Sequence, residues 1–278
     1  RYNLQCGRRS ARSLPALTPS IPRLMSNDKL EKLVELSGEF GREDRGWAIL
    51  GEGNTSVMGD ADSFYVKASG SCLGLASRSD FTEVNISQAL EFVAKPSMTD
   101  AEVQDALEAI KVDPDAKRPS VETFVHAVCL SIGDCKWVGH GHPESVLSIL
   151  CSQSGAKPYL EHIFPDAIVV CGRNFVVVPY IDPGFKLAHG VRDALVEFKG
   201  KYGKAPKIIF LENHGPFILG QSDIDVINTM QMLDKWSKII LANQLFGGCN
   251  YLAKTESDRI ENRLDEAYRR KRLLEQVR

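Results

Sequence analysis

The chain has 278 residues, of which 43% are hydrophobic and 25% are charged, and these proportions are typical of a globular protein with a sizeable core. Its formal net charge of −2 argues against nucleic acid or an acidic membrane surface as a general partner. No apolar stretch approaches the roughly 18 residues of a membrane span. The seven cysteines are scattered without a Cys-x-x-Cys pair, so we expect reduced thiols and a cytoplasmic location.

The beginning of the chain differs in composition from the rest. Residues 1–25 are rich in arginine, serine and proline and contain no acidic residue. This composition is typical of an organellar transit peptide or of a disordered extension, so we predict a leader outside the folded part. The folded domain is expected to span 26–250. A charged helix over 251–278 is expected to be part of that domain or appended to it.

The first predicted elements are a helix and three short strands. The helix is expected to begin at Asn27, a suitable cap, and to end near Gly41, because apolar residues between them recur at helical spacing. The last two of the three strands are expected to form a hairpin. The predicted strands are 47–50, 55–58 and 64–68.

Two loops of small residues, 51–56 and 68–71, lie at the same end of the predicted hairpin. Glycines allow a ligand to approach the backbone, and small polar side chains supply neutral hydrogen-bonding groups. Lys67 adds a positive charge beside them. The loops are therefore a candidate phosphate site, with ordinary turns as the alternative. No Gly-x-Gly-x-x-Gly motif opens a helix here, so a dinucleotide site is not predicted.

The segment 118–123 is predicted to open an apolar helix. Ser120 is a natural cap, and the free amide groups beside it form a potential anion site. Glu122 then lies in the first turn, either as a carboxylate that stabilises the helix dipole or as a catalytic or metal-binding group. His126 lies four residues later on the same face, where we expect it to pack rather than to bind a metal.

Two histidines follow in the next predicted strand, which spans 135–141. Alternate residues of a strand point to the same side, so the imidazoles of His140 and His142 are expected to face together. Neutral imidazole is a good ligand for zinc and similar divalent ions. The pair therefore supplies two corners of a metal site, unless the histidines merely flank a turn.

The second half of the chain is predicted to alternate between strands and helices. Its predicted strands are 167–171, 175–180, 207–211 and 217–220. Its predicted helices begin at Pro143 and cover 187–198, 223–246 and 254–278. His214 falls in the turn between the last two strands, where a side chain is presented rather than buried. It is the third candidate metal ligand.

Three histidines that leave one position open are a catalytic type of metal arrangement, and a nearby carboxylate is able to serve as a base. Two other families with a His-x-His motif fit poorly. Metallo-β-lactamases carry His-x-His-x-Asp-His, whereas Pro143 and Glu144 follow His142 here. Cupins place their glutamate several residues after the second histidine, and Glu144 comes too soon.

Five motifs in order resemble the class II aldolase/adducin family over roughly 30–246. They are Gly53-Asn54-Thr55-Ser56, Ala68-Ser69-Gly70, Pro119-Ser120-Val121-Glu122, His140-Gly141-His142-Pro143 and Asn213-His214-Gly215. The family includes L-fuculose-phosphate and L-rhamnulose-phosphate aldolases, L-ribulose-phosphate 4-epimerase and the non-catalytic adducin head. The resemblance implies a single α/β/α domain around a mainly antiparallel sheet, assembled as a homotetramer with sites at subunit interfaces.

The resemblance also implies the metal site. His140, His142 and His214 match the zinc-binding histidines of the family. Glu122 matches the glutamate that binds zinc in the empty site and acts as an acid and base once substrate displaces it. Tyr159 and Tyr180 are candidates for the tyrosine that aldolases contribute from a neighbouring subunit, with core packing as the alternative.

The phosphate loops of the family match a further set of positions. These are Asn54, Ser69, Gly70 and Ser120, with Thr55 and Lys67 beside them. Val121 departs from the aldolase pattern, which has a second serine there, so one phosphate contact is missing. The charge of Lys67 is a possible compensation.

The function implied by the resemblance is that of a metal-dependent aldolase. It would reversibly cleave a ketose 1-phosphate to dihydroxyacetone phosphate and an aldehyde through a zinc-stabilised enediolate. Zinc, or manganese, is the expected cofactor, and a sugar phosphate is the expected partner. The alternatives are a 4-epimerase, a dehydratase or decarboxylase on the same scaffold, and a non-catalytic adducin-like binding module. The adducin head lacks the metal histidines, so their presence here favours an enzyme.

Overall fold

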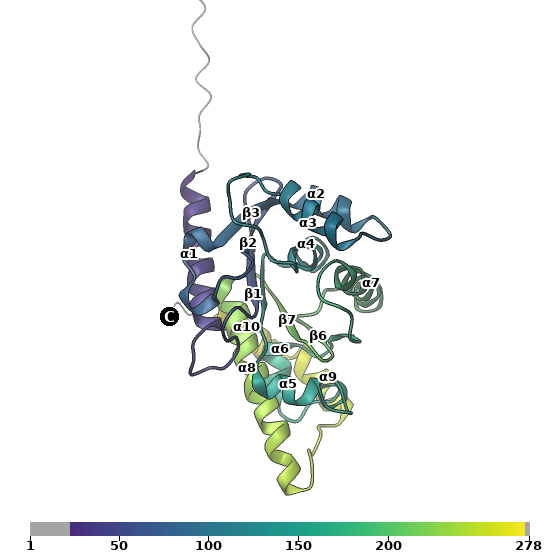
Figure 1. Cartoon of the computed structure of the whole chain (residues 1–278). Coiled ribbons are helices and arrows are strands. Elements are labelled where there is room, and N and C mark those ends of the chain that lie inside the picture. The colour runs from purple at the N-terminus through teal and green to yellow at the C-terminus, as the bar shows by residue number, and fades with distance from the viewer. Residues whose placement is uncertain (1–22, 276–278) are drawn as a thin grey trace, which may run out of the picture.

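The computed structural model describes residues 23–275 and the side chains of 28–274, so nearly all of the predicted leader lies outside the described residues. Seven strands of the described chain form one sheet in the order β3-β2-β1-β4-β7-β6-β5. Figure 1 labels five of them, β3, β2, β1, β7 and β6, which follow this order across the sheet. Neighbouring strands are antiparallel except β5, which is parallel to β6. The strands are β1 (Asn54–Met58), β2 (Ser63–Lys67), β3 (Phe81–Asn85), β4 (Trp137–His140), β5 (Val176–Val178), β6 (Ile208–Leu211) and β7 (Gly215–Gly220).

Helices cover both faces of the sheet. One face carries α2 (Ile86–Val93), α3 (Asp100–Ala109), α4 (Thr123–Ile132) and α7 (Phe185–Tyr202). The other carries α1 (Arg23–Phe40), α5 (Glu144–Leu150), α6 (Pro165–Cys171) and α8 (Asp223–Asn243). Two further helices, α9 (Lys254–Asn262) and α10 (Leu264–Glu275), pack against α6. The predicted α/β/α domain with a mainly antiparallel sheet is confirmed.

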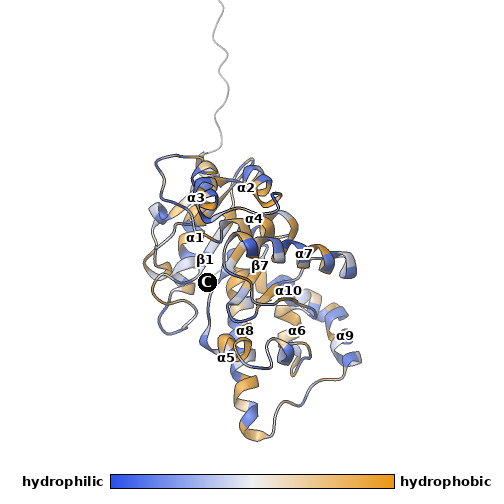
Figure 2. Cartoon of the chain, turned by 45° about the vertical axis from the view of Figure 1, so that its right-hand side comes forward, coloured by the Kyte–Doolittle hydropathy of each residue, from blue (hydrophilic) through white to orange (hydrophobic). Residues whose placement is uncertain are grey.

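The side chains of each strand alternate between two separate hydrophobic cores, as the pleat of a sheet requires. On β4, Val138 faces the core under α4 and α7, whereas Trp137 faces the core under α1 and α8. Helix α4 is apolar on all sides because it lies between the sheet and the neighbouring helices. Figure 2 shows this contrast, since α4 is mainly orange and the charged, peripheral α9 is mainly blue.

Several sequence-based assignments differ from the structure. Residues 167–171 belong to helix α6 rather than to a strand, because a short, fully buried apolar run has no periodicity and Pro165 starts a helix. Residues 47–50 lie in a loop rather than a strand, and Leu50 in this loop has a φ of 51°. The predicted charged helix over 254–278 is broken at Arg263, whose ψ of 135° is extended.

The first residues of two helices also differ from the predicted ones. Helix α1 begins at Arg23, four positions before the predicted cap Asn27. Helix α4 begins at Thr123, so Glu122 rather than Ser120 occupies the cap position. The prediction omitted β3 and α2 altogether. The hairpin, the His-bearing strand, β6, β7 and the long helix α8 were all predicted to within a few residues.

Candidate metal centre

His140 is the last residue of β4 and the most rigidly held member of the site. It lies opposite Asn54 of β1 and Phe217 of β7, so three strands meet at this position. Its ring is fully buried and stacks on Phe217 with 4.1 Å between ring centroids. Its Nδ1–H donates to the carbonyl oxygen of Pro216 over 3.0 Å. Because a carbonyl only accepts, this bond leaves the lone pair of the ring on Nε2.

Two glycines let the neighbouring backbone close in on His140. Gly53 has a φ of 65°, and a Cβ there would lie 2.6 Å from the carbonyl oxygen of His140. Gly215 has a φ of 155°, and a Cβ there would lie 2.6 Å from the carbonyl oxygen of Gly141. Larger residues would therefore push β1 and β7 away from the histidine strand.

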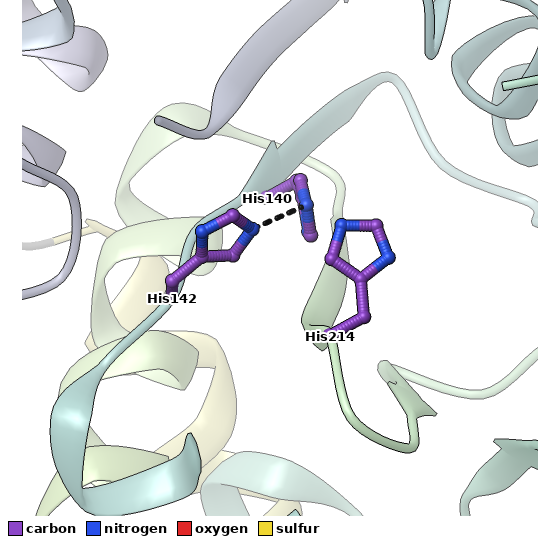
Figure 3. A group of neighbouring side chains, drawn as sticks. All are labelled: His140, His142 and His214. Atoms are coloured by element: carbon purple, nitrogen blue, oxygen red, sulfur yellow. Dashed lines mark hydrogen bonds between the residues drawn. The ribbon is translucent and has the colours of Figure 1, made fainter. Parts of the chain in front are cut away.

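Figure 3 shows the imidazoles of His140, His142 and His214 converging on one point. The Nε2 atoms of His140 and His142 lie 3.2 Å apart, as expected for alternate residues of a strand that has just ended. His214 joins them from the turn between β6 and β7, where Asn213 adopts a φ of 57°. One ligand nitrogen of each ring lies within 4.8 Å of the other two. This spacing suits three nitrogens around one divalent ion.

Glu122 brings a carboxylate to the same point. Its Oε2 lies 3.4 Å from Nε2 of His140, and its Oε1 lies 3.4 Å from Nε2 of His214. Oε1 is buried and accepts no hydrogen bond from the described residues. Burial raises the pKa of Glu122 to about 7. A buried carboxylate oxygen without a donor fits a site that holds a cation.

Burial also keeps the histidines in the form that binds metal. It lowers the pKa of His214 to about 4 and holds the pKa of His140 well below its usual value. The pKa of His142 is lowered too, because burial outweighs the opposing effect of the Glu52 carboxylate. All three rings are therefore neutral near pH 7, and neutral imidazole is the ligand form. The donor set fits zinc or a similar divalent ion.

Behind Glu122, a chain of buried polar side chains continues into the core. Nδ2 of Asn54 donates to Oε2 of Glu122 over 2.7 Å, and Oδ1 of Asn54 accepts from Nε2–H of His126. Nδ1 of His126 then accepts from the hydroxyl of Ser56 over 2.6 Å. Burial lowers the pKa of His126 to about 3, so its ring is neutral. The expectation that His126 packs behind the site agrees with this arrangement.

The small-residue loops lie side by side next to this chain. The Lys67 amine donates to the carbonyl oxygens of Gly51 and Ser71 over 2.9 Å and 2.6 Å, which joins loop 51–56 to loop 68–71. The amide of Ser120 donates to the carbonyl oxygen of Lys67 over 3.0 Å, so the segment 118–123 lies beside these two loops. Ser69 and its neighbour Gly70 are exposed at the rim. Asn54 also reaches this group, because its Nδ2 lies 3.3 Å from Oγ of Ser120.

Some predicted site residues do not reach the site. The hydroxyl of Thr55 bonds to Ser37 of α1 over 2.6 Å, on the opposite face of the sheet from Asn54. Tyr159 is fully buried, stacks on Phe210 and bonds through its hydroxyl to Ser237 over 2.6 Å. Core packing is therefore the role of Tyr159. Tyr180 is 58% exposed.

Glu52 also lies beside the site, although it was not among the predicted site residues. One of its carboxylate oxygens, Oε2, lies 3.8 Å from Nδ1 of His142, on the side of the ring that faces away from the other histidines. The signal was present in the sequence, because Glu52 is a lone carboxylate between Gly51 and Gly53 in a loop otherwise free of charge.

The chain is similar in sequence to known proteins. The protein "Uncharacterized oxidoreductase YuxG" of Bacillus subtilis is 28% identical over 243 residues, which are 83% of this chain and 33% of that protein. The chain thus spans about a third of that relative's length. The 3-oxo-tetronate 4-phosphate decarboxylase of Pectobacterium atrosepticum is 27% identical over 210 residues, or 75% of this chain and 82% of that protein.

A solved structure agrees with these matches. The N-terminal class II aldolase domain of a conserved protein from Thermoplasma acidophilum superimposes with a TM-score of 0.62 at 27% identity, covering 84% of this chain and 100% of that one. The sequence profile of the class II aldolase and adducin N-terminal domain matches residues 31–241. This match covers most of the chain and all of the metal-site residues, so the protein belongs to the class II aldolase and adducin family.

Proposed function

We propose that the protein is a metal-dependent carbon–carbon lyase that reversibly cleaves a ketose 1-phosphate to dihydroxyacetone phosphate and an aldehyde. The observation that carries the proposal is the convergence of three histidine rings beside the buried carboxylate of Glu122. The ring nitrogens of His140, His142 and His214 are proposed to hold zinc or manganese. The bound ion would polarise the carbonyl and the adjacent hydroxyl oxygen of the substrate.

Glu122 is proposed to move the proton at the substrate carbon that becomes nucleophilic. Its pKa of about 7 allows it to take and return a proton near neutral pH. Asn54 binds one carboxylate oxygen, Oε2, and thereby fixes the orientation of the group. The other oxygen, Oε1, has no hydrogen-bond donor among the described residues and is the one assigned to the substrate.

The phosphate group of the substrate is proposed to bind at the small-residue loops. Exposed Ser69 and Gly70 offer backbone and hydroxyl groups at the rim, and Ser120 lies beside them. The amine of Lys67 is buried beneath the loops, where burial lowers its pKa. Its positive charge would attract a phosphate at the rim electrostatically, without a direct hydrogen bond.

A second candidate reaction is the decarboxylation of a phosphorylated 3-oxo sugar acid. It is favoured by the name of the Pectobacterium relative, a 3-oxo-tetronate 4-phosphate decarboxylase. In both reactions a carbon–carbon bond near the substrate carbonyl breaks and its electron pair stays on the carbon nearer the carbonyl. One releases an aldehyde and the other carbon dioxide. The same ion and the same carboxylate therefore serve either substrate.

The proposal is tested with purified protein loaded with zinc or manganese. Ketose 1-phosphates and phosphorylated 3-oxo sugar acids are supplied in parallel, and released aldehyde, inverted sugar and carbon dioxide are measured. Aldehyde release supports the aldolase, an inverted sugar supports a 4-epimerase, and carbon dioxide supports the decarboxylase. Dialysis against a chelator is expected to abolish turnover, and added zinc to restore it. Turnover that is indifferent to the chelator contradicts the proposal.

A homotetramer with sites at subunit interfaces is also proposed. Large apolar side chains on the loops beside the metal centre support it, since Ile49, Leu50 and Leu75 are 54%, 81% and 84% exposed. Light scattering of the purified protein is expected to give four times the chain mass of 30.8 kDa. A monomeric mass contradicts this assembly.

A further inference from the structure

The three histidines differ in what holds the ring nitrogen that faces away from the centre. Nδ1 of His140 donates to a backbone carbonyl oxygen, whereas Nδ1 of His214 is buried with no partner among the described residues. Nδ1 of His142 faces the Oε2 atom of Glu52. We propose that Glu52 is a positioning residue of the metal centre, whose carboxylate accepts the Nδ1–H of His142 and keeps its Nε2 free and aimed at the ion.

The carboxylate of Glu52 is itself held in place. The backbone N–H of Ile49 donates to Oε2 of Glu52 over 3.1 Å, and the backbone N–H of Glu52 donates to the carbonyl oxygen of Ile49 over 3.0 Å. Leu50 closes this turn with its φ of 51°. The carbonyl oxygen of Gly51, the residue directly before Glu52, accepts from the amine of Lys67. The loop therefore presents a fixed negative charge rather than a mobile side chain.

His142 is the ligand that most needs such a partner. Its side chain is 21% exposed, compared with 0% for His140 and 11% for His214. Its backbone is fixed by a 2.6 Å hydrogen bond to the carbonyl oxygen of Trp47, but the described residues give its Nδ1 no hydrogen bond. The 3.8 Å between Nδ1 of His142 and Oε2 of Glu52 exceeds a hydrogen bond, so the proposed bond requires a small rotation of the ring.

A carboxylate behind a ligating imidazole has two effects. It fixes the tautomer, because the proton stays on the nitrogen that faces the carboxylate, and it makes the opposite nitrogen a stronger donor to the metal. Glu52 thus acts on the ion through His142 and touches neither the ion nor the substrate. Loss of such an outer partner typically weakens metal binding by about 10- to 100-fold.

The test compares zinc affinity in the wild type and in Glu52→Ala and Glu52→Gln variants, by competition with a chromophoric chelator. Glu52→Ala is expected to weaken zinc binding by roughly 10- to 100-fold. Glu52→Gln keeps a carbonyl oxygen as acceptor and is expected to fall between Glu52→Ala and the wild type. The matched control is Glu144→Gln, which removes an exposed carboxylate two positions from His142 whose side chain lies against Gly46.

A second readout follows the ring itself. In the zinc-loaded wild type, the Nδ1–H of His142 is expected to give a slowly exchanging proton signal in nitrogen-15 NMR, and the signal should vanish in Glu52→Ala. Because Glu52 lies on a loop and is 38% exposed, its variants are expected to fold. The inference rests on the proposed metal site. Wild type that binds no zinc overturns both, whereas normal zinc affinity in Glu52→Ala overturns the role of Glu52 alone.

Discussion

The two ends of the candidate site are built in different ways. The metal end consists of side chains, His140, His142, His214 and Glu122, whose ring nitrogens and carboxylate oxygens already lie close together. The loop end consists mainly of backbone segments that are joined by hydrogen bonds to carbonyl oxygens. One end is therefore defined by residue type and the other by the path of the chain.

Asn54 lies where the two ends meet. Family resemblance assigns it to the phosphate loops, but its amide group is occupied by Glu122 on one side and by His126 on the other. The geometry therefore makes Asn54 a partner of the Glu122 carboxylate first. Under the proposed function, each end would affect a different kinetic quantity. The metal end would act on turnover, and the loop end would act on the affinity for a phosphorylated substrate.

The largest effect is expected from Glu122→Gln. The amide keeps the shape of the carboxylate but takes no proton, so turnover should fall by at least ~100-fold, the usual scale of acid–base catalysis. The three histidine nitrogens are untouched, and the zinc content of the purified variant should stay close to one ion per chain. Metal analysis and steady-state kinetics check both points. Full turnover in this variant would assign proton transfer to another group.

A smaller effect, about 10-fold on kcat with little change in KM, is expected from Asn54→Ala. The change leaves Glu122 without its donor, and a misplaced general base loses part of a contribution worth roughly 100-fold or more. The lost buried hydrogen bonds also cost stability, about 1–3 kcal/mol for each group left unpaired. Kinetics at several substrate concentrations separate kcat from KM.

The control for Asn54→Ala is Ser63→Ala. Ser63 begins β2, is buried, and donates to Glu83 over 2.6 Å, so its loss lowers stability away from the site. Equal losses of kcat in both variants would mean that stability alone explains the effect. A rise in KM with unchanged kcat for Asn54→Ala would place Asn54 with the phosphate loops instead.

The sequence predicted which residues meet at the metal end better than it predicted the loop end, because the metal end depends on residue type and the loop end on the path of the backbone. Few residue types bind zinc, and the two-residue period of a strand brings His140 and His142 together without further information. His214 came from the resemblance and from its position in a turn. The loops, in contrast, depend on which backbone segments lie side by side. The glycines and serines of these loops do not indicate that the amine of Lys67 donates to two backbone carbonyl oxygens.

Face assignments show the same limit. Thr55 stands between Asn54 and Ser56 in one motif, yet the pleat turns its hydroxyl to Ser37 on the far face. The buried run 167–171 has no hydrophobic period, so its helical state depended on tertiary packing against α8 and α9. Glu52 stands out in its loop as a lone carboxylate, but its partner, His142, is distant in sequence, and only the fold shows that the two lie close together.

The smallest effect, and the sharpest test of the loop end, is expected from Val121→Ser. Val121 replaces a serine of the aldolase pattern, is 39% exposed and follows Ser120 directly, so a hydroxyl there carries no burial cost. One added hydrogen bond to the phosphate, worth about 0.5–1.5 kcal/mol, should lower KM for a phosphorylated substrate roughly 2- to 10-fold. Because the change leaves Glu122 and the histidines in place, kcat should stay constant.

The matched measurement for Val121→Ser uses the same substrate without its phosphate, for which KM should not change. Equal KM shifts for both substrates, or none for either, would mean that the phosphate binds away from these loops.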